Sequence, residues 1–375
     1  MPRFSVRSAV GVLALLAAAW ALVRHLRPRE DGTILVVDQH GWYARIPLEA
    51  YRRGVIDPFS WVVGAGPDAA SPVLFAKFGE AAATARGEEV CGVESAARLH
   101  PESPVVILTT ASFNATPFEP LRRAYGDRIR LLNVPDLVAR LKADGGLPEL
   151  VAWYRRGKWR DGYPLNNLSN GLRIALVYLF GGRYFDMDIL HVRSSAPLRN
   201  AVVWENDGTR VNNAVLVFDR RHDFVRALGQ QFAQHFNGMW WGANGPHRVT
   251  EALQALCGAF NATRRPPERP AFCDDVQVLP SRTYYPMHFT QAAEFFTAVD
   301  GAAAVDYAAQ PDVYGVHVWS SIPKAAGTTA RPGSALHRLA EQACPLTLAA
   351  FGLDAFAPLP GRTSADYQEP PRDLL

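Results

Sequence analysis

The sequence lacks the short glycine-rich motifs by which many proteins hold nucleotide phosphates. Neither a G-x-G-x-x-G stretch nor a Walker-type loop occurs in the 375 residues, so dinucleotide and P-loop binding have no motif behind them. The chain has four cysteines and no C-x-x-C pair, which argues against a cysteine zinc site. A nucleotide site in this chain therefore needs another way to hold phosphates, such as a metal ion.

The sequence also lacks a strong excess of charge of either sign, internal repeats and low-complexity tracts. A net charge of +3 is too small to indicate a nucleic-acid partner. A hydrophobic content of 48% with 20% charged residues is typical of a globular protein, and the length permits a large core.

One uncharged run lies at the N-terminus, from Ser8 to Val23. As a helix, its 16 residues would span about 24 Å, which is short for an average hydrocarbon core but suits thinner early-secretory membranes. The sequence favours a signal anchor over a cleaved signal peptide, although Ala19-Trp20-Ala21 has the form of a cleavage site. Both alternatives send the rest of the chain to the lumen or outside the cell.

An oxidising compartment would allow two disulfides among Cys91, Cys257, Cys273 and Cys344, in any of three pairings. The short loop between Cys257 and Cys273 favours that pair, and free buried thiols are the alternative. Three Asn-x-Ser/Thr triplets are candidate glycosylation sites: Asn114, Asn167 and Asn261.

The first half of the chain alternates between strand and helix patterns. Short apolar runs predict buried parallel strands, and the segments between them predict helices. The expected strands are 73–78, 105–108 and 129–132, and the expected helices are 91–100 and 135–142. This alternation predicts an α/β fold with a doubly wound, Rossmann-like sheet flanked by helices.

The segment richest in chemical signals begins with a helix pattern. Ser169 is a plausible N-cap, the apolar run from Leu172 to Phe180 has helical length, and Gly181 would end the helix. After the glycines the period changes from 3.6 to 2. In an extended 183–192, Tyr184, Asp186 and Asp188 share one face, and Phe185, Met187 and Ile189 share the other.

Asp186 and Asp188 would form a compact, oxygen-rich site at the end of a hydrophobic strand. Such a site suits Mn²⁺ or Mg²⁺, and these ions complete their coordination with substrate phosphates. The alternative for any Asp-x-Asp pair is a solvated turn. Two negative charges placed after an apolar strand cost stability without a cation, so the context favours a metal site.

These motifs resemble those of the α-1,4-glycosyltransferases, which include lactosylceramide α-1,4-galactosyltransferases and α-1,4-N-acetylglucosaminyltransferases. The similar segments follow in order along the chain: Cys91–Ala97, Leu168–Arg173, Gly181–Asp188, Val211–Phe218, Trp241–Pro246, Val316–Trp319 and Ala343–Pro345. The resemblance covers most of residues 71–346. It implies a GT-A fold and retaining transfer of galactose or an N-acetylhexosamine from a UDP-sugar, with Mn²⁺ or Mg²⁺, to a glycan or glycolipid acceptor.

The resemblance further implies a single-pass type II protein of the Golgi membrane with a lumenal catalytic domain. The expected parts are a cytoplasmic tail (1–7), a transmembrane signal anchor (8–23), a stem and entry segment (24–70), the catalytic domain (71–346) and a C-terminal tail (347–375).

The resemblance also implies roles for particular side chains. Asp186, Asp188 and His317 would hold the metal, and an alternating 316–319 strand places His317 and Trp319 on one face. Arg173 would meet the diphosphate or the donor sugar. The other residues expected at the donor are Asn170, Tyr184, Asn212, Asn213 and Trp319.

Two positions depart from the family pattern. Asn170 replaces an acidic residue that would bind donor hydroxyls, so it alters the donor or lowers activity. Asn244 replaces a glutamine expected to face the reaction centre, and it is predicted to be catalytic. The alternatives are a catalytically impaired sugar-nucleotide-binding protein of the same fold, a metal-dependent hydrolase and a secreted lectin.

The sequence contains no clear nucleophile for a retaining mechanism. Asp207 and Glu205 are the candidates, and nothing in the sequence singles out either one. A front-side attack, with the leaving phosphate as base, is therefore the preferred hypothesis over a covalent intermediate.

Overall fold

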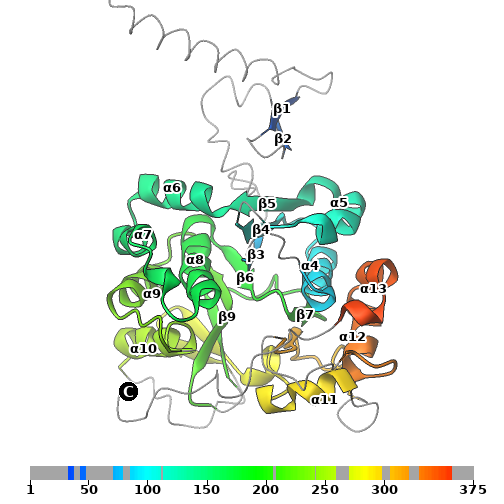
Figure 1. Ribbon diagram of the computed structural model, residues 1–375. Helices are drawn as coiled ribbons and strands as arrows, with labels where there is room; N and C mark the ends of the chain where they lie inside the picture. Colours follow the sequence, from blue (N-terminus) through cyan, green and yellow to red (C-terminus); the bar gives the residue numbers. More distant parts are fainter. Residues whose placement is uncertain are drawn as a thin grey trace, which may run out of the picture. The chain divides into compact units, whose positions relative to one another are not determined.

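The computed structural model describes residues 71–78, 85–110, 113–205, 208–240, 242–258, 270–297, 305–320 and 329–356, and the backbone of two earlier strands (Figure 1). The chain divides into two units, 1–69 and 70–375. In the first unit, β1 (Thr33–Val37) and β2 (Tyr43–Pro47) pair antiparallel. The anchor expected at Ser8–Val23 lies outside the described residues. Among those that are described, no helix combines the length and the apolar character needed to cross a membrane.

The second unit is built on a mixed sheet of eight strands in the order β10-β11-β8-β9-β6-β3-β4-β5. The strands are β3 (Val73–Lys77), β4 (Val105–Thr109), β5 (Ile129–Asn133), β6 (Gly182–Phe185), β8 (Ala201–Trp204), β9 (Val211–Phe218), β10 (Ala271–Cys273) and β11 (Val276–Leu279). β3, β4 and β5 are parallel, as the apolar runs predicted, whereas β9 is antiparallel to both β6 and β8. Every residue of β4 is buried, because helices cover both faces.

Ten helices are described around this sheet (Figure 1). They are α4 (Gly87–Leu99), α5 (Glu119–Tyr125), α6 (Val134–Asp144), α7 (Pro148–Arg155), α8 (Pro164–Phe180), α9 (Asp223–Gln234), α10 (Pro246–Leu256), α11 (Ala292–Thr297), α12 (Ala335–Ala343) and α13 (Pro345–Phe351). Figure 1 shows α7 to α10 on one side of the sheet and α4, α12 and α13 on the other. The predicted α/β class and the helices expected at 91–100 and 135–142 are confirmed.

The central helix α8 begins earlier than the sequence indicated. Its first residue is Pro164, which is suited to that position because it has no N–H to leave unpaired. Ser169 therefore lies inside the helix, and its prediction as the N-cap is wrong. The polar residues of the first turns conceal the helical pattern, since their side chains bind one another and neighbouring loops. Gly181 ends the helix with a φ of 64°, as expected of a glycine at this place.

The structure corrects the predicted disulfide. Cys91 of α4 is bonded to Cys344, which directly precedes α13, whereas Cys257 and Cys273 are free. The shortness of the loop between Cys257 and Cys273 did not determine the pairing. Instead, α4 packs against the junction of α12 and α13, which brings Cys91 beside Cys344. There Glu94 is buried and accepts hydrogen bonds from the backbone N–H groups of Leu346 (3.0 Å) and Thr347 (2.7 Å).

The packed part of the second unit also extends beyond residue 346. Helix α13 covers 345–351, and Phe356 is fully buried in a cluster with Leu336 and Leu339. The tail expected from residue 347 therefore needs correction in its first part, because this segment buries apolar surface.

One candidate glycosylation site is inaccessible. Asn167 is completely buried in α8, and its amide donates to the carbonyl of Asp161 at 2.6 Å. Asn114 is exposed, and its side-chain oxygen accepts from the N–H of Thr116 at 3.0 Å. Asn261 lies outside the described residues.

Two buried histidines, His100 and His191, should make the free energy of unfolding depend on pH. Burial and the nearby Arg183 and Arg128 lower the pKa of His100 to about 4, and burial and His100 lower the pKa of His191 to about 3. Below about pH 6.5 these two histidines become protonated in the unfolded chain but stay neutral in the folded chain. The free energy of unfolding should therefore fall with pH by about 1.4 kcal/mol per unit for each histidine, from about 6.5 down to each folded pKa.

This expectation can be checked by urea unfolding at pH 7.5, 6.0 and 5.0. His191→Phe should reduce the slope of stability against pH, because one of the two groups no longer titrates. His235→Gln, at an exposed histidine, is the matched control and should leave the slope unchanged. A His191→Phe protein with the parental slope would contradict the assignment.

Candidate functional site

The two aspartates lie where the chain leaves the large sheet. β6 ends at Phe185, and β7 (Ile189–His191) pairs with β12 (Gly315–His317) in a separate two-stranded sheet. Between them the chain turns, and the N–H of Ile189 donates to the carbonyl of Asp186 at 3.1 Å. The single extended strand predicted for 183–192 is thus wrong at the turn. The predicted apolar face is confirmed, since Phe185, Met187 and Ile189 are all buried in one hydrophobic cluster.

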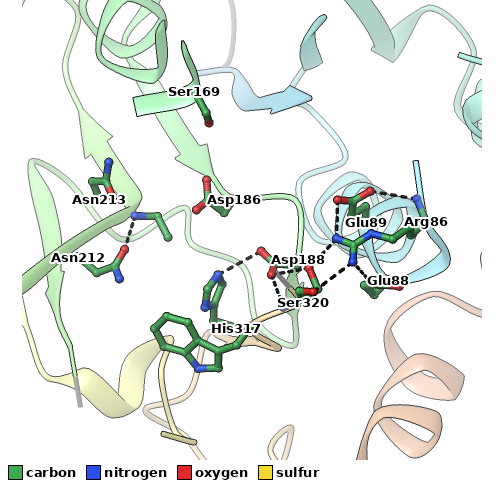
Figure 2. Close-up of polar contacts among 12 residues, drawn as sticks. Arg86, Glu88, Glu89, Ser169, Asp186, Asp188, Asn212, Asn213, His317 and Ser320 are labelled. Atoms are coloured by element: carbon green, nitrogen blue, oxygen red, sulfur yellow. Dashed lines mark hydrogen bonds and ion pairs between the residues drawn. The ribbon is translucent and has the colours of Figure 1, made fainter. Parts of the chain in front are cut away.

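His317 joins the two aspartates through the small sheet. It pairs in register with Ile189, directly after Asp188. Its Nε2 lies 3.1 Å from Oδ1 of Asp188, as Figure 2 shows. Asp186, Asp188 and His317 each offer one ligand atom, and these atoms all lie within 4.8 Å of one another. The structure therefore brings together the three residues that the sequence proposed as metal ligands.

The electrostatics of this cluster favour a charged carboxylate. Burial alone would raise the pKa of Asp188, but His317 and the hydrogen bonds from Ser320 outweigh it, and the pKa lies well below its ordinary value. Burial would lower the pKa of His317, but Asp188 and Asp186 raise it. Two carboxylates and one imidazole are donors that Mn²⁺ accepts, so the residues present fit such an ion.

Arg173 and Tyr184 both contact Asp186, and their contacts with the donor stay a prediction. Nη2 of Arg173 lies 3.1 Å from Oδ1 of Asp186, and the Tyr184 hydroxyl donates to the same oxygen at 2.8 Å. Arg173 also donates to the carbonyl of Asn213 at 2.9 Å and to Oγ of Ser169 at 2.8 Å. Tyr184 is completely buried. Both side chains hold Asp186 in place.

Asparagines from two elements meet beside the Asp pair. Nδ2 of Asn213, on β9, donates to Oδ1 of Asn170, on α8, at 2.8 Å. Nδ2 of Asn170 in turn donates to Asn166 at 3.0 Å, so the carboxamide of Asn170 is bound on both sides. Asn212 donates to Oε1 of Glu205 at 2.6 Å. The structure thus gathers the asparagines that the sequence assigned to the donor.

Asn244 is held by hydrogen bonds to its own loop and to α8. Its amide donates to Oδ1 of Asn167 at 3.1 Å, and its oxygen accepts from the N–H of Asn237 at 2.9 Å. Only 2% of the residue is exposed. Its hydrogen-bonding groups thus connect Asn237 with Asn167 of α8, and its catalytic role stays a prediction. The next residue, Gly245, does approach the asparagines, since a Cβ there would lie 2.8 Å from Oδ1 of Asn213.

The indole ring of Trp319 packs edge-to-face against the imidazole of His317. The two ring centroids lie 4.1 Å apart at 81°, and the indole N–H donates to the carbonyl of Met287 at 3.2 Å. Trp319 has a φ of 54°, a left-handed conformation that is uncommon for a bulky residue. This conformation reverses the chain, so that the N–H of Ser320 reaches Oδ2 of Asp188 at 2.8 Å.

Sequence reasoning missed Ser320, Arg86 and Glu89. Ser320 directly follows the 316–319 segment, so its position offered a weak signal. Arg86 and Glu89 belong to the start of α4, far away in the chain, and no local pattern connects them with Asp188.

The aspartate pair and the histidine lie beside a mixed α/β sheet, and two family models match the segments that carry them. A family model described as "Glycosyltransferase sugar-binding region containing DXD motif" matches residues 87–207. A second, "Alpha 1,4-glycosyltransferase conserved region", matches residues 217–351. The chain is a glycosyltransferase with a DXD region.

More particularly, it belongs to the alpha-1,4-glycosyltransferase family. It is 30% identical over 260 residues to lactosylceramide 4-alpha-galactosyltransferase of Homo sapiens, covering 69% of this chain and 71% of that protein. It is 24% identical over 267 residues to the alpha-1,4-N-acetylglucosaminyltransferase of Homo sapiens, covering 68% and 74%. A solved structure, PaToxG glycosyltransferase, matches with a TM-score of 0.37 and 12% identity over 56% of this chain and 75% of that one, too remote to carry an argument.

Proposed function

We propose that the protein is a retaining, metal-dependent glycosyltransferase of GT-A fold that transfers galactose or an N-acetylhexosamine from a UDP-sugar. The product would carry an α-1,4-type linkage on a glycan or glycolipid. The observation that carries the proposal is the convergence of Asp186 and Asp188, from the turn between β6 and β7, with His317 at the end of β12. The family relatives, one of which is named for lactosylceramide and galactose, support the acceptor and donor classes.

Asp186, Asp188 and His317 would hold Mn²⁺ or Mg²⁺, which as a Lewis acid would stabilise the charge on the departing UDP. Tyr184 and Nη2 of Arg173 hold Oδ1 of Asp186, and Nη1 of Arg173 donates to Oδ2 at 3.3 Å, so the orientation of the carboxylate is fixed before substrate arrives. Preorganisation of this kind saves the cost of reorienting charged groups during the reaction.

The donor sugar would lie against the asparagine side chains of α8 and β9, with Trp319 at the metal side. Asn170 and Asn213 present amide groups, which bind sugar hydroxyls without adding charge. Because Asn213 and Asn166 each use one hydrogen-bonding position of the Asn170 amide, contacts with the donor sugar would use its second N–H and its remaining lone pair.

Front-side attack remains the mechanism that we propose. Glu205 is held by Asn212 at 2.6 Å, and that hydrogen bond would restrain it from acting as a nucleophile. Asp207 lies outside the described residues. The acceptor hydroxyl would then lose its proton to the leaving phosphate.

We also propose the cellular setting implied by the family: a type II Golgi protein with the signal anchor at 8–23, the stem at 24–70 and the catalytic domain from residue 71 in the lumen. The Cys91–Cys344 disulfide supports an oxidising compartment.

The proposal is tested by donor hydrolysis with the purified full chain. UDP-galactose, UDP-N-acetylglucosamine, UDP-N-acetylgalactosamine and UDP-glucose are each incubated with and without Mn²⁺, and UDP release is measured. Slow, Mn²⁺-dependent release from one donor is expected. No release from any donor, with no metal-dependent binding of UDP, would refute the proposal.

A second candidate, a sugar-nucleotide-binding protein with impaired transfer, rests on the occupied amide of Asn170. Metal-dependent UDP binding without turnover of any donor would favour it. Asn170→Asp would then be expected to restore turnover, because a carboxylate accepts sugar hydroxyls more strongly than an amide.

A further inference from the structure

Asp188 is supported by Ser320 and Arg86, which are distant from it in the sequence, one on each side. Its Oδ2 accepts two hydrogen bonds from Ser320, one from the backbone N–H and one from the hydroxyl, each at 2.8 Å. The same hydroxyl accepts a hydrogen bond from Nη2 of Arg86 at 2.8 Å, and the Ser320 carbonyl accepts from Nη1 at 3.2 Å. Figure 2 shows this row of contacts from α4 to the metal cluster.

The direction of the hydrogen bonds follows from the chemistry of the groups. A guanidinium has only donors, so the Ser320 oxygen can only accept from Arg86. The single hydroxyl proton of Ser320 then points to Asp188. Oδ2 of Asp188 accepts both hydrogen bonds from Ser320, and Oδ1 lies 3.1 Å from Nε2 of His317. The carboxylate is thereby held as an acceptor with one oxygen directed to the metal cluster.

Arg86 is itself fixed by carboxylates at the start of α4. Its Nη2 lies 2.7 Å from Oε1 of Glu89 and its Nη1 lies 3.0 Å from Oε1 of Glu88, both of which are buried. Glu89 also accepts from the Arg86 backbone N–H at 3.0 Å and pairs with Lys77 at 2.6 Å. A guanidinium held in this way has little freedom to leave Ser320.

We propose that Ser320 is a positioning residue of the metal site, and that Arg86 sets the direction of its hydroxyl. This inference rests on the proposed function, because it assumes that Asp188 holds a divalent metal. Neither residue would touch the substrate. Their effect would be to hold the Asp188 carboxylate in one orientation, with Oδ1 directed to the ion.

The test measures Mn²⁺ affinity of the full chain in the presence of saturating UDP, by electron paramagnetic resonance of free Mn²⁺. Ser320→Ala should raise the Mn²⁺ Kd about 10- to 100-fold, as is usual for residues that orient metal ligands. Arg86→Lys keeps the charge beside Glu88 and Glu89 but lacks the fork that also reaches Ser320, so it should raise the Kd about 3- to 10-fold.

Ser334→Ala is the matched control. Ser334 is also fully buried, and its Oγ accepts from the N–H of His337 at 3.2 Å at the start of α12. Its loss should lower the thermal midpoint without changing the Mn²⁺ Kd. A merely structural role for Ser320 would give the same pattern as this control.

The outcomes separate the two proposals. A parent protein that binds no Mn²⁺ with UDP would overturn the metal site itself, and this inference with it. A parent protein that binds Mn²⁺, with unchanged affinity in Ser320→Ala, would overturn this inference alone. If Ser320→Ala does not fold, the Arg86→Lys affinity decides: an unchanged Kd overturns the inference and a raised Kd supports it.

Discussion

Asp188→Asn is expected to reduce sugar transfer about a thousandfold, equivalent to about 4 kcal/mol of transition-state stabilisation. The substitution removes a charge, but the orientation of the new amide matters as much. Ser320 presents two donors to one side of residue 188, so the amide oxygen must stay there. The amide NH₂ would then face His317 and the metal cluster, where a donor cannot ligate a cation.

The measurement is kcat and KM for the active UDP-sugar over a range of Mn²⁺ concentrations. Asp219→Asn is the matched control, since Asp219 pairs with Arg199 at the exposed surface and should keep the parental rate. Circular dichroism would confirm that Asp188→Asn is folded. Full activity of Asp188→Asn at saturating Mn²⁺ would refute the role assigned to this carboxylate.

The second large effect concerns stability. The double substitution Cys91→Ser with Cys344→Ser should lower the free energy of unfolding by about 4–5 kcal/mol, because the bond closes a loop with a sequence separation of 253. A disulfide that closes a long loop removes much conformational entropy from the unfolded chain and so stabilises the folded state relative to it. The native geometry at the bond is supported by Glu94, which holds the start of α13 against α4.

Urea unfolding of the parent and the double variant, with and without a reductant, measures this effect. Reductant should destabilise the parent protein and leave the double variant unchanged. Cys257→Ser is the control, because Cys257 is a free thiol whose substitution should keep the response to reductant. Equal unfolding midpoints for the parent and the double variant under oxidising conditions would contradict the prediction.

The sequence predicted the elements whose signals are local. The apolar runs of β3, β4 and β5 predicted parallel strands, and the three strands are parallel. Of the three, only β4 is buried along its whole length, and β5 lies at the edge of the sheet. The Asp pair and His317 were also predicted correctly as neighbours, because their segments carry a specific pattern.

The direction of side chains was harder to predict. The sequence did not predict that Arg173 and Tyr184 contact Asp186, where a buried charge requires partners. It also did not predict that the Asn244 amide binds Asn237 and Asn167, because these hydrogen bonds depend on how its loop meets α8. The contacts of Arg86 with Ser320 depend on packing between distant segments, which no local pattern encodes.

Helix α4 has a consequence for how the protein is made. Several of its partners come from the last part of the chain: Ser320 for Arg86, Cys344 for Cys91, Leu346 and Thr347 for Glu94. At about 5–20 residues per second, a separation of 253 residues means that the ribosome delivers Cys344 roughly 10–50 s after Cys91. During that interval the helix holds a free thiol and acidic side chains without their final partners. The nascent chain would therefore depend on chaperones and thiol-exchange enzymes during that interval. A ribosome that stops before residue 344 would release a product with neither its disulfide nor its completed α4 interface.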